Sequence, residues 1–233
     1  MPLADFHRII ISTALDAARA AGFRDVALGG GNALIVRAGS SRRTQDVDLF
    51  CRKAADLPAI ATVVVEAIEA AGYRVERRED QQGWWEEEEA EIVELIVSAP
   101  GGSSEAEMQI AYFYYAEDEV VPGLGPVLSL DDLGGWKTTT VANRRAERDF
   151  VDYALLRQQY TKERLFELAA ERDPGLEPAD YADAAVHLDQ RVKDSDLAPY
   201  LAPGQDAAAV RAAFADWSRD TRRDRHQHHQ AGK

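Results

Sequence analysis

The sequence predicts an α+β fold, with a mixed sheet in the first half of the chain and a bundle of helices behind it. Short runs of β-branched and aromatic residues alternate with helical spacing of apolar residues up to about residue 128. Beyond that point the strand signals largely stop, whereas the helical spacing continues. We therefore expect an α/β domain at 1–128, a helical domain at 129–222 and a flexible polar tail at 223–233.

The first domain is expected to alternate helices with short strands. Apolar side chains recur every three or four residues in the predicted helices, which are 3–21, 33–37 and 58–71. Gly22, Gly39 and Gly72 follow these helices as stop signals, and Asn32 is expected to cap the second one. Strands are expected at 26–28, 47–50, 73–75, 92–98 and 108–115. The glycine-rich stretch 100–104 suits the loop of a hairpin between the last two strands.

The second domain is expected to consist of successive helices. Their apolar spacing predicts helices at 131–145, 147–159, 162–172, 178–192 and 207–222. We find no internal repeat and no low-complexity linker in the sequence, so the two domains are expected to follow one another directly.

The charge balance limits the partners of this protein. Lys and Arg number 27 against 41 Asp and Glu, which gives a net charge of −14 and a pI near 4.8. This excludes binding of nucleic acid by a bulk positive field, because phosphates would be repelled at long range, but leaves a local basic site open. The single cysteine, Cys51, excludes a disulfide framework and a multi-cysteine zinc site. Without a secretion signal or an apolar run near the roughly 20 residues of a membrane span, we expect a cytoplasmic protein with no membrane association.

The most informative stretch joins a glycine pair to two acids. Gly30 and Gly31 follow a predicted strand, and such glycines let backbone N–H groups approach a phosphate at the start of a helix. Asp46 and Asp48 are two residues apart, so a strand directs both to the same face. Two such carboxylates can hold a hard cation such as Mg²⁺ together with nucleotide phosphates. Taken singly, the glycines are usually only a turn and the acids only a solvated strand end, so the interpretation depends on their combination.

These motifs resemble the nucleotidyltransferase superfamily with a polymerase-β-like core, and more closely its AbiEii/AbiGii and MenT toxin group. The family pattern, Gly-Gly-(Thr/Ser)-Ala-Leu followed by Arg-(Ser/Thr)-x-Asp-(Ile/Val)-Asp-Leu, is similar to residues 30–34 and 43–49. The resemblance implies a polymerase-β-like nucleotidyltransferase core with a mixed sheet. It also implies that Asp46 and Asp48 are catalytic and hold Mg²⁺ or Mn²⁺. The residues of this block that it assigns to nucleotide binding are Gly30, Gly31, Asn32, Arg43 and Thr44.

A second block with family character lies in the helical domain. Lys137 lies in a predicted helix and is followed by Arg144. The resemblance implies that Lys137 is a catalytic lysine in contact with phosphates, and that Arg144 and Asp149 belong to the nucleotide site. Asp149 and Asp152 are three residues apart and share a helix face. The alternative is a charged amphipathic helix in which Arg148 pairs with neighbouring acids.

Two positions depart from the family pattern. A third carboxylate is usual on a later strand, where the best match is Gln109. A neutral amide coordinates a metal weakly and cannot act as a general base. Glu107, two residues earlier on the same strand face, is the other candidate for the third metal position. Asn32 replaces a commoner hydroxyl residue, and its amide can still donate to a phosphate.

The expected function is Mg²⁺-dependent transfer of a nucleoside monophosphate from a nucleoside triphosphate (NTP) to a hydroxyl acceptor. The resemblance implies a toxin of a toxin–antitoxin pair, with the 3′ end of tRNA as acceptor and a cognate antitoxin protein as partner. Two alternatives stay open. One is a small-molecule transferase of the aminoglycoside-modifying kind, which shares the core, and the other is a degenerate, non-catalytic nucleotide-binding scaffold, which Gln109 favours.

Overall fold

The computed structural model describes residues 3–40, 42, 44, 46–78 and 92–222. The chain forms two compact units, residues 1–133 and 134–233. The tail expected at 223–233 lies outside the described residues.

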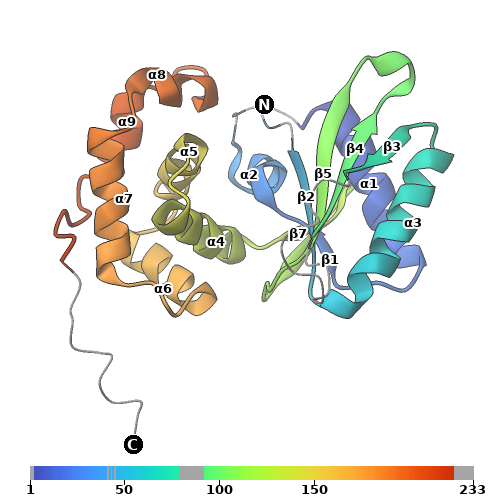
Figure 1. Cartoon of the computed structure of the whole chain (residues 1–233), viewed down its shortest axis with the longest axis horizontal. Coiled ribbons are helices and arrows are strands. Elements are labelled where there is room, and N and C mark those ends of the chain that lie inside the picture. Colours follow the sequence, from blue (N-terminus) through green and yellow to red (C-terminus); the bar gives the residue numbers. More distant parts are fainter. Residues whose placement is uncertain (1–2, 41, 43, 45, 79–91, 223–233) are drawn as a thin grey trace, which may run out of the picture. The chain divides into compact units, whose positions relative to one another are not determined.

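In the described part of the first unit, a seven-stranded sheet runs in the order β3-β4-β5-β2-β1-β7-β6 (Figure 1). Its strands are β1 (Val26–Leu28), β2 (Asp46–Cys51), β3 (Arg74–Arg77), β4 (Ile92–Ser98), β5 (Glu105–Tyr112), β6 (Asp118–Val121) and β7 (Gly125–Leu128). β2 pairs with β5, and β1 with β7, in parallel, whereas the other neighbours are antiparallel. The predicted mixed sheet is confirmed, with β2 at its centre.

Helices cover this sheet. α1 (Asp5–Ala20) and α3 (Leu57–Ala70) pack against each other on one side, and α2 (Gly30–Ala38) lies on the other (Figure 1). Short helical turns follow at η1 (Ala54–Asp56) and η2 (Pro100–Gly102). Apolar residues of α1, α3 and β2 fill the core, and Ile11, Ile60 and Leu49 are no more than 1% exposed. The helical and alternating spacings of the sequence put these residues on the inward faces of their elements.

One strand of the last part of the sheet is shorter than expected, and one hairpin was not predicted. The strand expected at 108–115 ends at Tyr112, after which Tyr115 turns inward to 1% exposure while Tyr114 stays 58% exposed. β6 and β7 then form a further hairpin before residue 129, the region in which the strand signals were expected to stop. Gly125 and Pro126 make β7 hard to predict from the sequence, because glycine weakens a strand and proline cannot donate a ladder hydrogen bond. The partner that makes β7 a strand is β1, which pairs Leu28 with Val127.

The helix expected at 33–37 begins three residues earlier. Gly29 is the N-cap of α2, whose first residue is Gly30. Asn32 therefore lies inside the first turn, and the prediction that it caps the helix is wrong. Its amide instead donates to the main-chain carbonyl of Asp46 at 2.7 Å. A fully buried amide needs a partner, and the neighbouring strand supplies one.

Helices build the second unit. They are α4 (Leu130–Asn143), which begins in the first unit, α5 (Glu147–Leu156), α6 (Lys162–Arg172), α7 (Pro178–Gln190), α8 (Asp194–Leu197), η3 (Ala198–Tyr200) and α9 (Ala207–Ala212). The expected helices between 131 and 192 are confirmed, with ends shifted by no more than a few residues. The helix expected over 207–222 is wrong in length, because it ends at Ala212 and the following turns direct Phe214 and Trp217 into the core.

An aromatic cluster and a glycine contact hold the second unit together. Trp217 donates its indole N–H to the hydroxyl of Tyr153 at 3.0 Å, and its ring meets that of Tyr181 edge-on at 5.5 Å. A Cβ on Gly135 of α4 would lie 2.7 Å from the main-chain oxygen of Leu168 in α6. The close approach of these two helices therefore requires glycine at position 135.

Candidate functional site

The glycine turn after β1 lies against the carboxylate of Asp48. Gly29 donates its N–H to the main-chain carbonyl of Asp48 at 2.8 Å, which fixes the turn to β2. Gly30 has a φ of +59°, and a Cβ built on it would lie 1.6 Å from Oδ2 of Asp48. Only glycine combines this backbone conformation with this approach. The structure thus brings the glycine turn and Asp48 into contact.

Arg42 and Thr44, two described residues between α2 and β2, lie close to Gly31. A Cβ on Gly31 would lie 2.8 Å from Nη2 of Arg42 and 3.0 Å from Oγ1 of Thr44. Thr44 also donates its hydroxyl to the main-chain carbonyl of Asp46 at 3.4 Å. Thr44 is therefore a neighbour of the glycine turn, and so is Arg42, which is 7% exposed and which the sequence did not single out. Arg43 lies outside the described residues.

The acids of β2 share one face of the strand. Val47 and Leu49 are fully buried, whereas Asp46 and Asp48 alternate with them and are half-buried. Because side chains alternate along a strand, both carboxylates point to the side on which the glycine turn meets Asp48.

A buried chain of hydrogen bonds supports the start of β2. Asn32 donates to the carbonyl of Asp46 and accepts, through Oδ1, from Nδ1 of His7 at 3.4 Å. His7 comes from α1, and its burial lowers its pKa from the usual 6.5, against the opposing effects of the Asn32 hydrogen bond and the charge of Asp46. The amide of Asn32 thus contacts the strand that carries the acids. Its predicted contact with a phosphate stays a prediction.

The face that carries Asp48 continues over two further strands. Gln109 on β5 is in register with Asp48, and Glu94 on β4 is in register with Gln109. Nε2 of Gln109 donates to Oε1 of Glu94 at 3.1 Å. Glu107, the other candidate for a third position, is in register with Asp46. Sequence reasoning missed Glu94, although a single acid inside an otherwise apolar strand is a signal that could have found it.

The paired acids suit a magnesium ion that is completed by its substrate. Among the residues that the structure describes, no group of three or more His, Cys, Asp or Glu side chains could hold a metal ion. Mg²⁺ usually takes one or two carboxylates and fills its other positions with water and substrate phosphates. Asp46 and Asp48, on one face beside a glycine turn, fit that donor set.

The second block forms ion pairs within the helical unit. Nζ of Lys137 lies 2.8 Å from Oδ2 of Asp152, and Arg144 contacts both carboxylate oxygens of Asp149 at 2.6 and 3.0 Å. Asp149 and Asp152 are 0% and 1% exposed, whereas the side chain of Arg144 is 47% exposed. Both acids thus pair with cations of their own block. The contacts of Lys137 and Arg144 with phosphates stay predictions.

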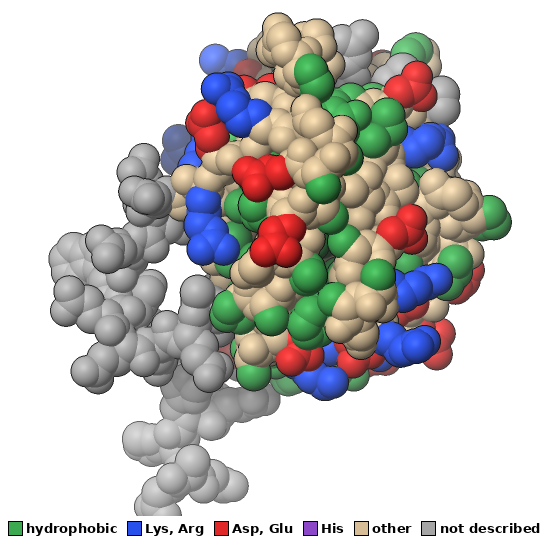
Figure 2. All heavy atoms as spheres, turned by 90° about the vertical axis from the view of Figure 1, so that its right-hand side faces the viewer, with side chains coloured by type: hydrophobic (Ala, Val, Ile, Leu, Met, Phe, Trp, Pro, Cys, Tyr) green, Lys and Arg blue, Asp and Glu red, His purple; other side chains and the backbone are tan. Residues whose placement is uncertain are grey.

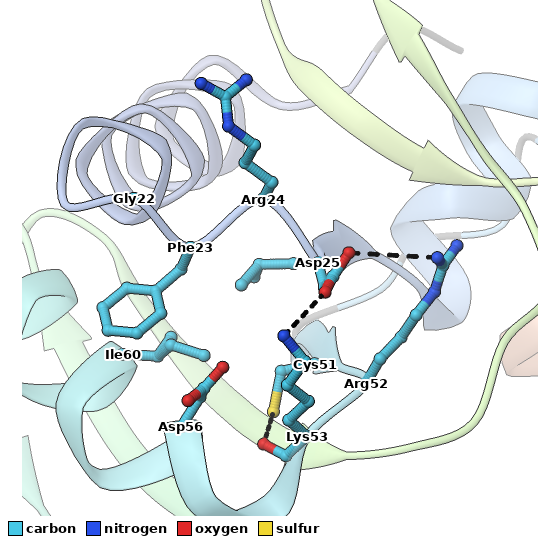
Figure 3. Close-up of a pocket in the computed structure, with 10 residues that line it drawn as sticks. Gly22, Phe23, Arg24, Asp25, Cys51, Arg52, Lys53, Asp56 and Ile60 are labelled. Carbon is cyan, nitrogen blue, oxygen red and sulfur yellow. Dashed lines mark hydrogen bonds and ion pairs between the residues drawn. The ribbon is translucent and has the colours of Figure 1, made fainter.

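A separate hollow of about 300 Å³ lies at the other end of β2 (Figure 3). It is lined by Gly22, Phe23, Arg24, Asp25, Val26, Cys51, Arg52, Lys53, Asp56 and Ile60. Asp25 pairs with Arg52 at 3.9 Å and with Lys53 at 3.4 Å. Cys51 is buried, and burial raises the pKa of its thiol. This hollow is distinct from the glycine turn, since Cys51 ends the strand that Asp46 begins.

A mixed sheet whose central strand carries paired acids beside a glycine turn is the arrangement of a nucleotidyltransferase. The chain belongs to the AbiEii family, because the sequence model described as a nucleotidyl transferase AbiEii toxin of a type IV toxin–antitoxin system matches residues 13–217. The resemblance carried by residues 30–34 and 43–49 is thus confirmed.

Solved structures from Helicobacter pylori share the fold. JHP933 is 18% identical, with 91% of each chain covered and a TM-score of 0.57. A candidate nucleotidyltransferase is 17% identical, with 91% of this chain and 94% of that chain covered and a TM-score of 0.57. The comparison with curated proteins gave no match. In the part of the chain that the structure describes, no helix has the length and apolar character needed to cross a membrane.

Proposed function

We propose that this nucleotidyltransferase moves a nucleoside monophosphate from an NTP to the 3′ end of tRNA in a reaction that depends on Mg²⁺. The approach of Gly30 to Asp48 carries the proposal, because it joins a phosphate-binding turn to a metal-binding carboxylate with no side chain between them. Membership of the AbiEii family supports the transfer chemistry.

The triphosphate would bind at the start of α2. Gly30 and Gly31 are the first residues of this helix, where main-chain N–H groups and the helix dipole favour an anion. Thr44 beside Gly31 would add a hydroxyl donor. Arg43, from the same segment, stays a predicted contact of the nucleotide.

Asp46 and Asp48 would hold the Mg²⁺ or Mn²⁺ ion. When bound, such an ion offsets the charge of the phosphates and polarises the α-phosphate as a Lewis acid. The chain's own part is to keep both carboxylates on one face. It does so through the alternation of β2 and through the bond from Asn32 to the carbonyl of Asp46.

In the transfer itself, the oxygen of the acceptor hydroxyl forms a bond to the α-phosphorus of the triphosphate. The bond from that phosphorus to the bridging oxygen breaks, pyrophosphate leaves with the electron pair, and the hydroxyl proton passes to water. Lys137 and Arg144, each paired with an acid of the helical unit, stay predicted contacts of the phosphates.

The charge of the chain and its family support a tRNA end as the acceptor. A net charge of −14 disfavours contact with a long stretch of nucleic acid, whereas a few local cations suit a single RNA end. Membership of a toxin family supports growth arrest as the biological effect and a cognate antitoxin as the partner.

Incubation with NTPs radiolabelled at the α-phosphate, Mg²⁺ and total bacterial tRNA tests this function. The wild-type protein should label tRNA, and EDTA should abolish the labelling. Asp46→Asn and Asp48→Asn should each lower the rate by about a thousandfold, because a catalytic metal supplies several kcal/mol of transition-state stabilisation. Asp16→Asn, an exposed position on α1, is the matched control and should keep the wild-type rate.

Other outcomes identify the competing functions. Labelling of an aminoglycoside but not of tRNA would replace the acceptor by a small molecule. Mg²⁺-dependent binding of NTP without any product would indicate a scaffold. Unchanged labelling in Asp48→Asn would remove the paired acids from the reaction. In cells, expression of the wild-type protein should arrest growth, and expression of Asp48→Asn should not.

A further inference from the structure

A row of polar side chains runs across the sheet from the position of the glycine turn. Gln109 on β5 lies opposite Asp48 in a parallel ladder, and Glu94 on β4 lies opposite Gln109 in an antiparallel one. Residues directly opposite one another in a ladder point to the same face of the sheet. Asp48, Gln109 and Glu94 therefore lie in one row, which starts beside Gly30 and includes a second carboxylate on β4.

Gln109 holds the carboxylate at the end of this row. Its Nε2 donates to Oε1 of Glu94 at 3.1 Å, and both side chains are half-buried. A hydrogen bond from an amide to a carboxylate is charge-assisted, so it fixes the orientation of the acid. A carboxylate offers about four acceptor sites, so Glu94 retains capacity for a further donor.

Glu107, the neighbouring acid on this face, has a different environment. It lies opposite Asp46, and Arg78 donates to its Oε1 at 3.0 Å. The two side chains of this ion pair are 48% and 44% exposed, so Glu107 is a partly solvated acid with a cation beside it. Glu94 is a half-buried acid that accepts from the amide of Gln109. Arg78 donates its main-chain N–H to the carbonyl of Glu94 at 3.0 Å and extends over the same face to Glu107. Of the two acids, Glu94 is the less exposed and the one that Gln109 orients.

The spacing of the row fits one reacting group. Neighbouring strands are about 4.8 Å apart, so the backbones of Asp48 and Glu94 are about 10 Å apart. An attacking oxygen must lie about 3 Å from the phosphorus that it attacks. A phosphate bound next to Asp48 and an acceptor hydroxyl next to that phosphate would together occupy the space over Gln109. The hydroxyl would then lie next to Glu94.

We propose that Glu94 binds the attacking hydroxyl of the acceptor and that Gln109 is a positioning residue for Glu94. This inference rests on the proposed function, because it assigns the acceptor side of the same site. The hydroxyl donates its hydrogen bond to the carboxylate of Glu94, which turns a lone pair of the hydroxyl oxygen toward the α-phosphorus. As the oxygen–phosphorus bond forms, the proton passes to Glu94 and from there to water. Gly30, Asp46 and Asp48 form the donor side of the row, and Glu94 forms the acceptor side.

Steady-state transfer to total bacterial tRNA, combined with calorimetric titration of the NTPs in Mg²⁺, tests this assignment. Glu94→Gln keeps the size of the side chain and removes its charge. We expect kcat/KM for tRNA to fall by about ten- to hundredfold, which is the loss of a hydrogen bond to a charged group. The Kd for NTP should stay within about threefold of the wild-type value, because the donor side is intact.

Further variants separate positioning from structure. Glu94→Asp keeps the carboxylate and should recover part of the loss, whereas Gln109→Leu removes the amide donor and should show an intermediate loss. Glu105→Gln is the matched control. Glu105 is an exposed acid on β5, the strand that carries Gln109, and it accepts from Ser98 at 3.2 Å. This variant should keep wild-type kinetics. Asp48→Asn should weaken the binding of NTP.

The outcomes distinguish this inference from the function on which it rests. Wild-type kinetics in Glu94→Gln, with Asp48→Asn inactive, would overturn the role of Glu94 and leave the proposed function standing. Weakened NTP binding in Glu94→Gln would also overturn it, because Glu94 would then act on the donor side. A wild-type protein without transfer activity would refute both. If Glu94→Gln fails to fold, Glu94→Asp and Gln109→Leu provide the same comparison.

Discussion

At the scale of single residues, Gly30 meets two requirements at once. Its φ of +59° lies in the left-handed region that side chains disfavour, and a Cβ would lie 1.6 Å from Oδ2 of Asp48. The first requirement alone costs an alanine about 1 kcal/mol, whereas the second forces the carboxylate to move. Gly39 shows the first requirement without the second. It has a φ of +67°, but no atom lies within 4 Å of a Cβ built on it.

We expect Gly30→Ala to lower the transfer rate by at least about a hundredfold, because a displacement of about 1 Å in a reacting group has an effect of that size. It should also lower the free energy of unfolding by about 2–3 kcal/mol. Gly39→Ala should cost about 1 kcal/mol and keep the wild-type rate. Urea unfolding and labelled transfer check both variants. Equal transfer rates in the two would show that the contact of Gly30 with Asp48 is dispensable.

The protonation of His7 makes part of the protein's stability depend on pH. His7 donates to Asn32, which in turn donates to the carbonyl of Asp46. Because burial lowers the pKa of His7, the folded protein keeps the ring neutral where the unfolded chain already binds a proton. The unfolded state therefore holds more protons than the folded state once the pH falls below the usual pKa of 6.5. In that window the free energy of unfolding decreases with falling pH.

Replacing His7 should remove this part of the pH dependence. His7→Gln keeps an amide donor for Asn32 but has no proton to gain. Between about pH 7.5 and about pH 5.5, the free energy of unfolding should decrease less steeply for the variant than for the wild type. Urea titrations at several pH values measure this difference. Parallel curves for the two proteins would contradict the assignment to His7.

At the scale of elements, a buried ion pair joins α4 to α5. Lys137 and Asp152 lie 2.8 Å apart with exposures of 13% and 1%. The pair of Arg164 and Glu167 on α6 is 41% and 66% exposed. Loss of one partner from a buried pair leaves an uncompensated charge inside the protein, whereas an exposed pair contributes little.

We expect Asp152→Ala to lower the free energy of unfolding by about 3 kcal/mol, and the exposed control Glu167→Ala to lower it by less than about 0.5 kcal/mol. Adding Lys137→Met to Asp152→Ala should restore part of the loss, because no buried charge is then left without its partner. Urea unfolding of the single and double variants gives the coupling between the two residues. Strictly additive losses would mean that Lys137 and Asp152 act independently.

The elements that could be predicted are those with a clear local period. Residues 162–172 and 92–98 were expected as a helix and a strand, and α6 and β4 have the same bounds. β7 escaped prediction, because Gly125 and Pro126 weaken its pattern and its partner β1 lies far away in the sequence. A short strand of this kind is made by its neighbour rather than by its own composition.

At the scale of the whole molecule, the acidic balance limits how the protein attracts polyanions. On the face shown in Figure 2, acidic and basic side chains are interspersed among neutral ones. A net charge of −14 then acts as a weak, general repulsion of polyanions, and any attraction for phosphate must be local. Lys137 and Arg144 are each paired with a buried acid, and their contact with phosphates stays a prediction.

The sequence by itself was sufficient for the donor side of the candidate site. Gly30, Asp46 and Asp48 lie within twenty residues of one another, and a turn followed by an alternating strand dictates how they point. Only the tertiary structure decided that Glu94 lies in the same row as Asp48 and that His7 donates a hydrogen bond to Asn32. Local periodicity tells which side chains face inward. The identity of the neighbouring strand or helix depends on the packing of distant segments, which no short pattern contains.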